Sequence, residues 1–210
     1  MFIFDFSSTK ADNCNSLLFI LPVYLILYIL IYMKSQTATI IETVSNKLPD
    51  SSNPKYKEKM DHYWAEFDKS KSGYLNSAEV ERGISSVMKL PDVFPLERML
   101  KKAFKATKGK IAPLTKYGED RISKAEFHYL AQYIKNFYIY WAIFNNLDDD
   151  HDKKLSLPEF NKAKHIFEAN NIAIPDVKEL FNSIDKHHGG FIEFYDFCDW
   201  VLTNRHTFQV

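Results

Sequence analysis

The sequence contains few of the residues that mark several common protein classes. Its 210 residues include only two cysteines, Cys14 and Cys198, near opposite ends of the chain. They form no disulfide framework and are too few to hold a structural zinc ion by themselves, which favours a reducing compartment. With six glycines, 46% hydrophobic and 15% aromatic residues, the chain is neither collagen-like nor disordered. The composition predicts a mostly helical protein with one or two filled cores.

Net charge is also absent, because 27 basic residues balance 27 acidic ones. A neutral chain lacks the basic surface of nucleic-acid-binding proteins, so we expect no nucleic-acid partner. No Asn-x-Ser/Thr triplet occurs, which argues weakly against a glycosylating secretory route. We find no nucleophile–base pair, phosphate-binding loop or cofactor fingerprint, and therefore predict no catalytic or organic-cofactor site and no enzyme activity.

One uncharged run, Leu17–Met33, stands out near the start of the sequence. Its length is at the lower limit for a transmembrane helix. Three alternatives are open: a single-pass membrane anchor, a cleaved signal peptide, or a stretch that is not translated because initiation occurs at Met33. A signal peptide is disfavoured because the preceding residues carry Lys10 against Asp5 and Asp12, not a positive start.

The charges around this run predict the location of the rest of the chain. Lysines are more frequent after residue 33 than before the run, and the positive-inside rule then places the large C-terminal part in the cytoplasm. We expect a cytoplasmic domain, anchored through residues 1–34 or free in the cytoplasm if translation starts at Met33. Residues 35–55, interrupted by Pro49 and Pro54, are predicted to form a linker.

From residue 56 onward, helical segments alternate with short loops in four similar units. Each unit has an aromatic residue four positions before the first residue of its loop. The four pairs are Trp64 and Asp68, Phe104 and Lys108, Phe144 and Asp148, and Phe181 and Asp185. This register predicts two pairs of helix-loop-helix units, over residues 56–137 and 138–202.

The first loop, Asp68–Glu79, has oxygen donors at alternate positions. Counted from 1 to 12, they are Asp68 at 1, Ser70 at 3, Ser72 at 5, the carbonyl of Tyr74 at 7, Asn76 at 9 through a water, and Glu79 at 12. Gly73 at position 6 permits a sharp turn. The loop resembles those of the EF-hand (calmodulin-like) calcium-binding superfamily, because calcium takes six to eight oxygen ligands.

The third loop, Asp148–Glu159, carries the most negative charge. Its candidate ligands are Asp148, Asp150, Asp152, the carbonyl of Lys154, Ser156 at position 9, and Glu159. Carboxylates gathered around one point repel one another unless a cation neutralises them, so we expect this loop to bind calcium first. Lys153 replaces the usual glycine at position 6, which predicts a left-handed residue at a cost of about 1 kcal/mol.

The fourth loop, Asp185–Asp196, departs further from the pattern. Position 3 is His187, and position 5 is Gly189, which has no side-chain oxygen. Asp196 at position 12 is shorter than glutamate, so the loop, with Asp185 and Asp196 as its weaker candidates, is predicted to take Mg²⁺ or to stay empty. Zinc is disfavoured because no cysteine and no ligand pair at helical spacing lie nearby.

The second loop is predicted to bind no calcium. It runs from Lys108 to Glu126, seven residues more than the twelve of the pattern, and it begins with a lysine. Its helices nevertheless keep the register of the other units. The apolar residues at position 8 of the four loops are predicted to pair them through short strands; these are Leu75, Ile122, Leu155 and Ile192.

Together the four units resemble the EF-hand superfamily over about residues 55–201, with a fainter similarity to small calcium-binding proteins of ciliates and other protists. The resemblance implies an all-α fold of two paired lobes. It also implies a calcium sensor or buffer whose partner is an amphipathic target helix or a protein complex. The uncharged run Leu17–Met33 adds the membrane as a further expected partner. The alternative is a scaffolding subunit that uses degenerate EF-hands for packing. Only Met60, Met88 and Met99 lie in the helical part, which argues against a promiscuous methionine-rich surface.

Overall fold

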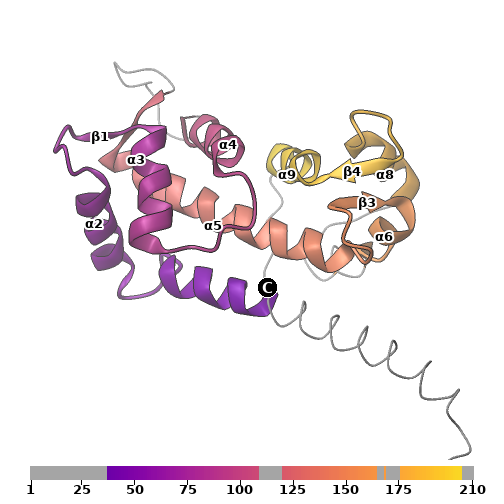
Figure 1. Cartoon of the computed structure of the whole chain (residues 1–210), viewed down its shortest axis with the longest axis horizontal. Helices are drawn as coiled ribbons and strands as arrows, with labels where there is room; N and C mark the ends of the chain where they lie inside the picture. Colours follow the sequence, from indigo (N-terminus) through magenta and orange to yellow (C-terminus); the bar gives the residue numbers. More distant parts are fainter. Residues whose placement is uncertain (1–36, 109–119, 165–167, 169–175, 205–210) are drawn as a thin grey trace, which may run out of the picture. The chain divides into compact units, whose positions relative to one another are not determined.

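A computed structural model describes residues 37–108, 120–164, 168 and 176–204 (Figure 1). The uncharged run Leu17–Met33 and residues 109–119 of the second loop lie outside the described residues. In the described ranges, we find no helix that combines the length and the apolar character needed to span a bilayer.

The first described element is a helix over residues 37–47. It lies within residues 35–55, where the sequence predicted a linker. Val44 and Leu48 are buried in the core, and Ile40 packs against it. These three residues are spaced four apart and therefore share one face of the helix. The polar composition of the segment and its two prolines obscured this apolar face.

The first pair of helix-loop-helix units extends from α2 into the first part of α5 (Figure 1). Its elements are α2 (Tyr56–Phe67), β1 (Tyr74–Leu75), α3 (Ser77–Arg82), the π-helix η1 (Gly83–Met88), α4 (Leu96–Lys108), β2 (Ile122–Ser123) and α5 (Lys124–Leu147). β1 and β2 are antiparallel, with Leu75 opposite Ile122. The prediction that position-8 residues pair the loops is confirmed here.

The second pair begins in the last part of α5 and continues to α9. It comprises β3 (Lys154–Ser156), α6 (Leu157–Asn161), α8 (Val177–Ile184), β4 (Phe191–Glu193) and α9 (Phe194–Thr203). β3 and β4 are antiparallel, with Leu155 opposite Ile192. Because α5 is continuous over 24 residues, the expected boundary at residues 137 and 138 lies inside one helix. The all-α fold with two paired lobes is confirmed.

Aromatic packing holds the first lobe together beneath its paired loops. Trp64 and Phe67, on the last turn of α2, each meet Phe127 of α5 edge-to-face, with ring centroids 5.5 Å apart. Gly83 permits close packing against the same cluster, since a Cβ atom there would lie 2.3 Å from the Phe67 ring. The helix ends that carry the loops are therefore anchored in a closely packed core.

Candidate metal-binding loops

The helix ends fix where three of the loops begin. The amide of the first loop residue donates to the carbonyl of the aromatic residue four positions earlier, at 2.9 Å for Asp68 to Trp64, 3.0 Å for Asp148 to Phe144, and 2.9 Å for Asp185 to Phe181. This is the last hydrogen bond of each preceding helix. The four-residue spacing seen in the sequence thus marks the point where helix gives way to loop.

A capping box fixes the other end of the first three loops. Position 9 or its equivalent caps the next helix, and the glutamate at position 12 bonds back to the backbone of that cap. The pairs are Asn76 with Glu79, Ser123 with Glu126, and Ser156 with Glu159. Each glutamate is thereby held at the N-terminus of its helix with a carboxylate oxygen committed to the turn.

In the first loop, Asp68 is almost fully buried and hydrogen-bonded. Its carboxylate accepts from the amides of Ser72 and Gly73, both at 2.9 Å. Burial raises the pKa of Asp68, but these hydrogen bonds and those from the Ser70 and Ser72 hydroxyls outweigh it, so the pKa lies below its usual value. Gly73 adopts the left-handed conformation at φ +80°. Asp68 is therefore stable as a carboxylate without further partners.

The remaining candidate ligands of the first loop surround one cavity of about 210 Å³. Its lining residues are Ser70, Ser72, Tyr74, Asn76, Glu79 and Arg121. The first five stand at positions 3, 5, 7, 9 and 12 of the loop. Arg121 comes from the second unit, just before β2, and brings a positive charge that sequence reasoning did not place there. The structure thus gathers the predicted ligands and adds a cationic neighbour.

In the third loop, Asp148, Asp150 and Asp152 each offer one oxygen, and these oxygens lie within 4.8 Å of one another. Asp148 is only 3% exposed. Its Oδ2 accepts from the amide of Lys153 at 2.9 Å, whereas its Oδ1 is buried and has no hydrogen-bond partner among the described residues. Burial, followed by the nearby charges of Asp152 and Glu159, raises the pKa of Asp148. Without a bound cation, the folded chain therefore disfavours the negative charge of Asp148.

The other residues of this loop complete an oxygen-rich turn. Glu159 accepts from the amide of Asp149 at 2.9 Å and from the amide and hydroxyl of Ser156 at 2.9 and 2.6 Å. Lys153 adopts φ +67°, the left-handed conformation expected at position 6. A buried carboxylate oxygen with no partner, among other carboxylates, is what a bound cation would satisfy. These residues fit calcium.

The second loop contains a buried ion pair. The ammonium of Lys108, at position 1, lies 3.0 and 3.1 Å from the two carboxylate oxygens of Glu126, and both side chains are 3% exposed. Glu126 also accepts from the amide and hydroxyl of Ser123, both at 2.8 Å. Sequence reasoning excluded calcium here but missed this buried ion pair, which links the two ends of the loop.

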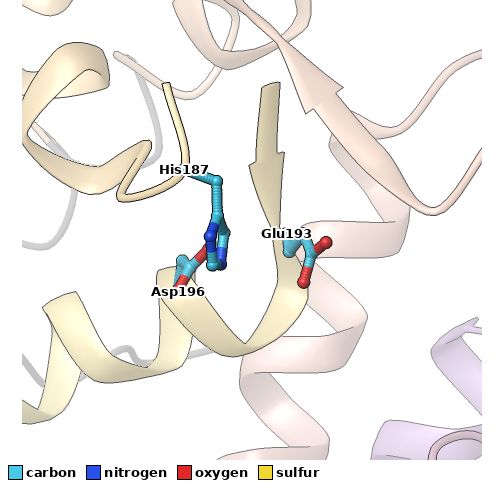
Figure 2. A group of neighbouring side chains, drawn as sticks. All are labelled: His187, Glu193 and Asp196. Carbon is cyan, nitrogen blue, oxygen red and sulfur yellow. The ribbon is translucent and has the colours of Figure 1, made fainter. Parts of the chain in front are cut away.

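The fourth loop arranges its two predicted ligands differently. The carboxylate of Asp185 accepts from the amides of Gly189 and Gly190 at 3.2 and 2.8 Å. Asp196 is instead grouped with His187 and Glu193, whose ligand atoms lie within 4.8 Å of its own (Figure 2). Sequence reasoning missed Glu193, although it stands at position 9, where a carboxylate can serve as a ligand.

A small apolar cavity adjoins the third loop. Its volume is about 200 Å³, and its wall includes Phe94, Trp141 and Phe194. Asp148 and Lys153 of the loop also line it. Asp148 therefore belongs to the acidic group and also lines an apolar cavity.

Two family models match this chain in succession. The FCaBP EF-hand domain model matches residues 44–134, and the EF-hand domain pair model matches residues 137–202. Between them they include all four loops. The join between the two matches falls inside α5, close to the boundary expected between the two pairs of units.

Curated relatives agree with these matches. The chain is 27% identical over 162 residues to the flagellar calcium-binding protein of Trypanosoma cruzi, covering 76% of this chain and 77% of the relative. It is 26% identical over 166 residues to the flagellar calcium-binding protein TB-17 of Trypanosoma brucei brucei, covering 78% and 71%.

A similar solved structure is that of a homologue of programmed cell death 6 protein from Leishmania major Friedlin, at 18% identity and a TM-score of 0.39, covering 67% of this chain and 69% of the other. Both family models describe EF-hand domains, and together they match most of residues 44–202. This chain belongs to the EF-hand superfamily of calcium-binding proteins.

Proposed function

We propose that this protein is a calcium sensor that binds Ca²⁺ first in the third loop and then in the first. The ligands are Asp148, Asp150, Asp152, the Lys154 carbonyl and Glu159 in the third loop, and Asp68, Ser70, Ser72, the Tyr74 carbonyl and Glu79 in the first. The buried, unpartnered Oδ1 of Asp148 carries the proposal. Bound calcium supplies the positively charged partner that this oxygen lacks.

The order of binding follows from the two aspartates at position 1. Asp148 has a raised pKa and lies near other carboxylates, whereas Asp68 has a lowered pKa and is satisfied by the amides and hydroxyls around it. A cation therefore gains more at the third loop. The first loop has fewer carboxylates, and Arg121 lines its cavity, which reduces its attraction for a cation.

Isothermal titration with calcium tests these sites. We expect two bound ions in the wild-type protein. Glu159→Gln and Asp148→Ala should each remove the tighter ion, and Glu79→Gln should remove the weaker one. Asp196→Asn in the fourth loop is the matched control and should leave both calcium ions bound. If the wild type binds a further ion that Mg²⁺ displaces and that Asp196→Asn loses, magnesium is assigned to the fourth loop. Unchanged stoichiometry and affinity in both Glu159→Gln and Asp148→Ala would refute the assignment.

The apolar cavity beside Asp148 favours a sensor over a buffer. Because Asp148 and Lys153 line that cavity, a change in their positions on binding alters the wall that also contains Trp141. We therefore expect calcium to change tryptophan fluorescence, and Trp141→Phe to abolish most of the change. If calcium alters neither this fluorescence nor binding of an amphipathic target helix, the scaffolding role is favoured instead.

A membrane attachment through Leu17–Met33 and a cytoplasmic location are part of the same proposal. They are supported by the uncharged run and by the lysines that follow it. Cell fractionation of the full chain and of a variant starting at Met33 tests the attachment. Equal amounts of the two proteins in the membrane fraction would contradict it.

A further inference from the structure

The fourth loop gathers a different kind of ligand set from the oxygen-only sets of the first and third loops. His187 belongs to the loop, Glu193 is the last residue of β4, and Asp196 lies in the first turn of α9. Figure 2 shows His187 and Asp196 side by side, with Glu193 near them at the end of β4. One ligand atom from each lies within 4.8 Å of the others. The group therefore combines one imidazole nitrogen with two carboxylates.

The distances suit a small ion. The Nε2 of His187 lies 3.7 Å from Oδ2 of Asp196. Bonds of about 2.0–2.1 Å to a tetrahedral zinc ion place neighbouring ligand atoms about 3.3–3.4 Å apart. Asp196 is 4% exposed, whereas the His187 side chain is 64% exposed and has room to change its rotamer. Small side-chain rotations would close the group around one ion.

The same loop is poorly suited to calcium. Gly189 at position 5 offers no side-chain oxygen, and the carboxylate of Asp185 is bonded to the amides of Gly189 and Gly190. The three grouped side chains offer too few donors for an ion that takes six to eight oxygens. Zinc needs four ligands, accepts imidazole, and commonly uses three protein ligands with one position left for water. The sequence disfavoured zinc in this loop, but the structure brings Glu193 close to His187 and Asp196. We propose that these three residues form a zinc site.

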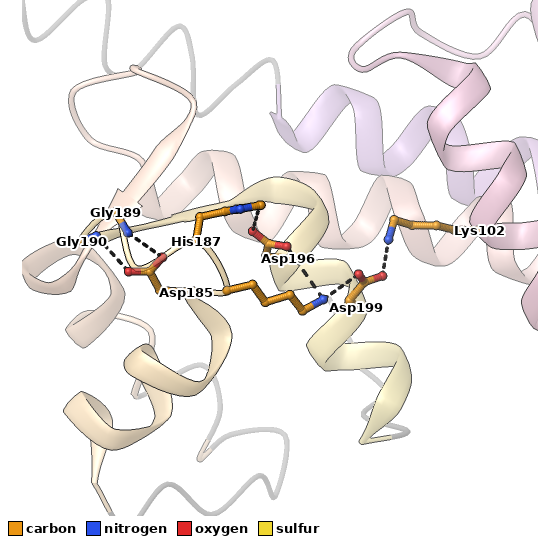
Figure 3. Close-up of polar contacts among 8 residues, drawn as sticks. Lys102, Asp185, His187, Gly189, Gly190, Asp196 and Asp199 are labelled. Atoms are coloured by element: carbon orange, nitrogen blue, oxygen red, sulfur yellow. Dashed lines mark hydrogen bonds and ion pairs between the residues drawn. The ribbon is translucent and has the colours of Figure 1, made fainter.

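Neighbouring lysines leave room for this ion. Lys186 lies 3.8 Å from Oδ1 of Asp196, but it makes a closer contact of 2.8 Å with Asp199. Lys102 pairs with the same Asp199 from α4 (Figure 3). Lys154, opposite Glu193 in the β3–β4 register, places its ammonium 3.8 Å from the centre of the Phe191 ring. Asp199 is thus the alternative partner of Lys186, and Phe191 is that of Lys154. The carboxylates of Glu193 and Asp196 together match the charge of Zn²⁺.

Zinc titration of the full, untagged chain tests the site, with calcium and magnesium in excess so that the oxygen-only loops are occupied. We expect one tightly bound zinc ion. His187→Ala should weaken it at least about tenfold, because even the loss of an outer-shell partner costs 10–100-fold in metal affinity. His188→Ala is the matched control, since this neighbouring histidine is outside the group, and it should bind zinc like the wild type.

Cobalt provides a second measurement, because a tetrahedral Co²⁺ site with a nitrogen ligand absorbs visible light. The absorption should be present in the wild type, in His188→Ala and in the third-loop variant Glu159→Gln, and absent in His187→Ala and Glu193→Gln. Circular dichroism confirms that each variant is folded. Equal zinc affinity in wild type and His187→Ala, or complete displacement of zinc by magnesium, would overturn the proposal. This result is separable from calcium binding by the third loop, which Glu159→Gln removes and His187→Ala leaves in place.

Discussion

The ammonium of Lys108 lies between the two carboxylate oxygens of Glu126, at 3.0 and 3.1 Å, in the second loop. These residues stand where a calcium-binding loop has its first and last ligands. A lysine side chain thus provides, within the chain, a positive charge that the first and third loops are proposed to receive from an ion. The ion pair links the two ends of the second loop, and the strand of this loop pairs with that of the first loop.

This buried pair predicts a large loss of stability when one partner is removed. Lys108→Met should lower the free energy of unfolding by about 3–5 kcal/mol, because it leaves the Glu126 carboxylate buried without its counter-charge. The double variant Lys108→Met/Glu126→Gln should recover part of that loss. Urea denaturation in calcium-free buffer measures both.

The control for this prediction is an exposed pair from the same lobe. Lys124 and Asp61 lie 2.9 Å apart, with side chains that are 61% and 49% exposed. Lys124→Met should change the free energy of unfolding far less than Lys108→Met does, because solvent screens an exposed pair. A loss in Lys108→Met no larger than that of the control would show that the buried pair does not hold the second loop.

Asp148 is predicted to stabilise the calcium-bound protein at the expense of the calcium-free one. Its Oδ1 is buried without a partner, and burial with nearby negative charge raises its pKa. In calcium-free buffer at neutral pH, Asp148→Asn should therefore raise the free energy of unfolding, because it removes one buried negative charge from beside Asp152 and Glu159. In saturating calcium the order should reverse, because the wild type gains binding energy that the variant lacks.

Asp68→Asn is the matched comparison at position 1 of the first loop. Hydrogen bonds to its carboxylate outweigh burial and lower the pKa of Asp68, so its charged form is favoured in the folded state. The substitution should lower calcium-free stability. Thermal or urea unfolding that moves in the same direction for both variants would contradict the distinction between the two loops.

Lys153 is predicted to carry backbone strain at position 6. Because its φ is +67°, Lys153→Gly should be more stable than Lys153→Ala by about 1 kcal/mol, since alanine keeps the left-handed penalty and glycine does not. The same two substitutions at Lys154, in strand β3, should show the opposite order. Thermal unfolding of the four variants tests the prediction, and an equal order at both positions would refute it.

Arg121 is predicted to weaken calcium binding in the first loop. It lines the same cavity as five candidate ligands, where its positive charge opposes that of the ion. Arg121→Ala should raise the calcium affinity of the first loop by about threefold to tenfold, as expected for one charge several ångströms from a divalent ion in a solvated site. Arg121→Lys should leave it nearly unchanged.

Calorimetric titration in the Glu159→Gln background isolates the first loop for this measurement. Lys124→Ala is the control, because Lys124 is close in sequence but does not line the cavity. An equal rise in affinity for Lys124→Ala would attribute the effect to net charge alone and not to the position of Arg121.

The sequence by itself determined the features that depend on local spacing. A twelve-residue turn places alternate side chains toward one point, so the residues of the first and third loops predict which positions are the candidate ligands. The position-8 pairings, Leu75 with Ile122 and Leu155 with Ile192, follow from the same register. The superfamily was identified correctly for this reason.

Only the tertiary structure decided which distant side chains meet and which atoms remain unpaired. Lys108 reaches Glu126 across 18 positions, and Glu193 joins His187 because a strand and a helix start converge on one loop. The apolar face of residues 37–47 is recognised as part of the protein's interior only because the core packs against it in the folded chain. Whether an oxygen such as Oδ1 of Asp148 has a partner depends on every group packed around it, since burial and hydrogen bonding are properties of the folded chain.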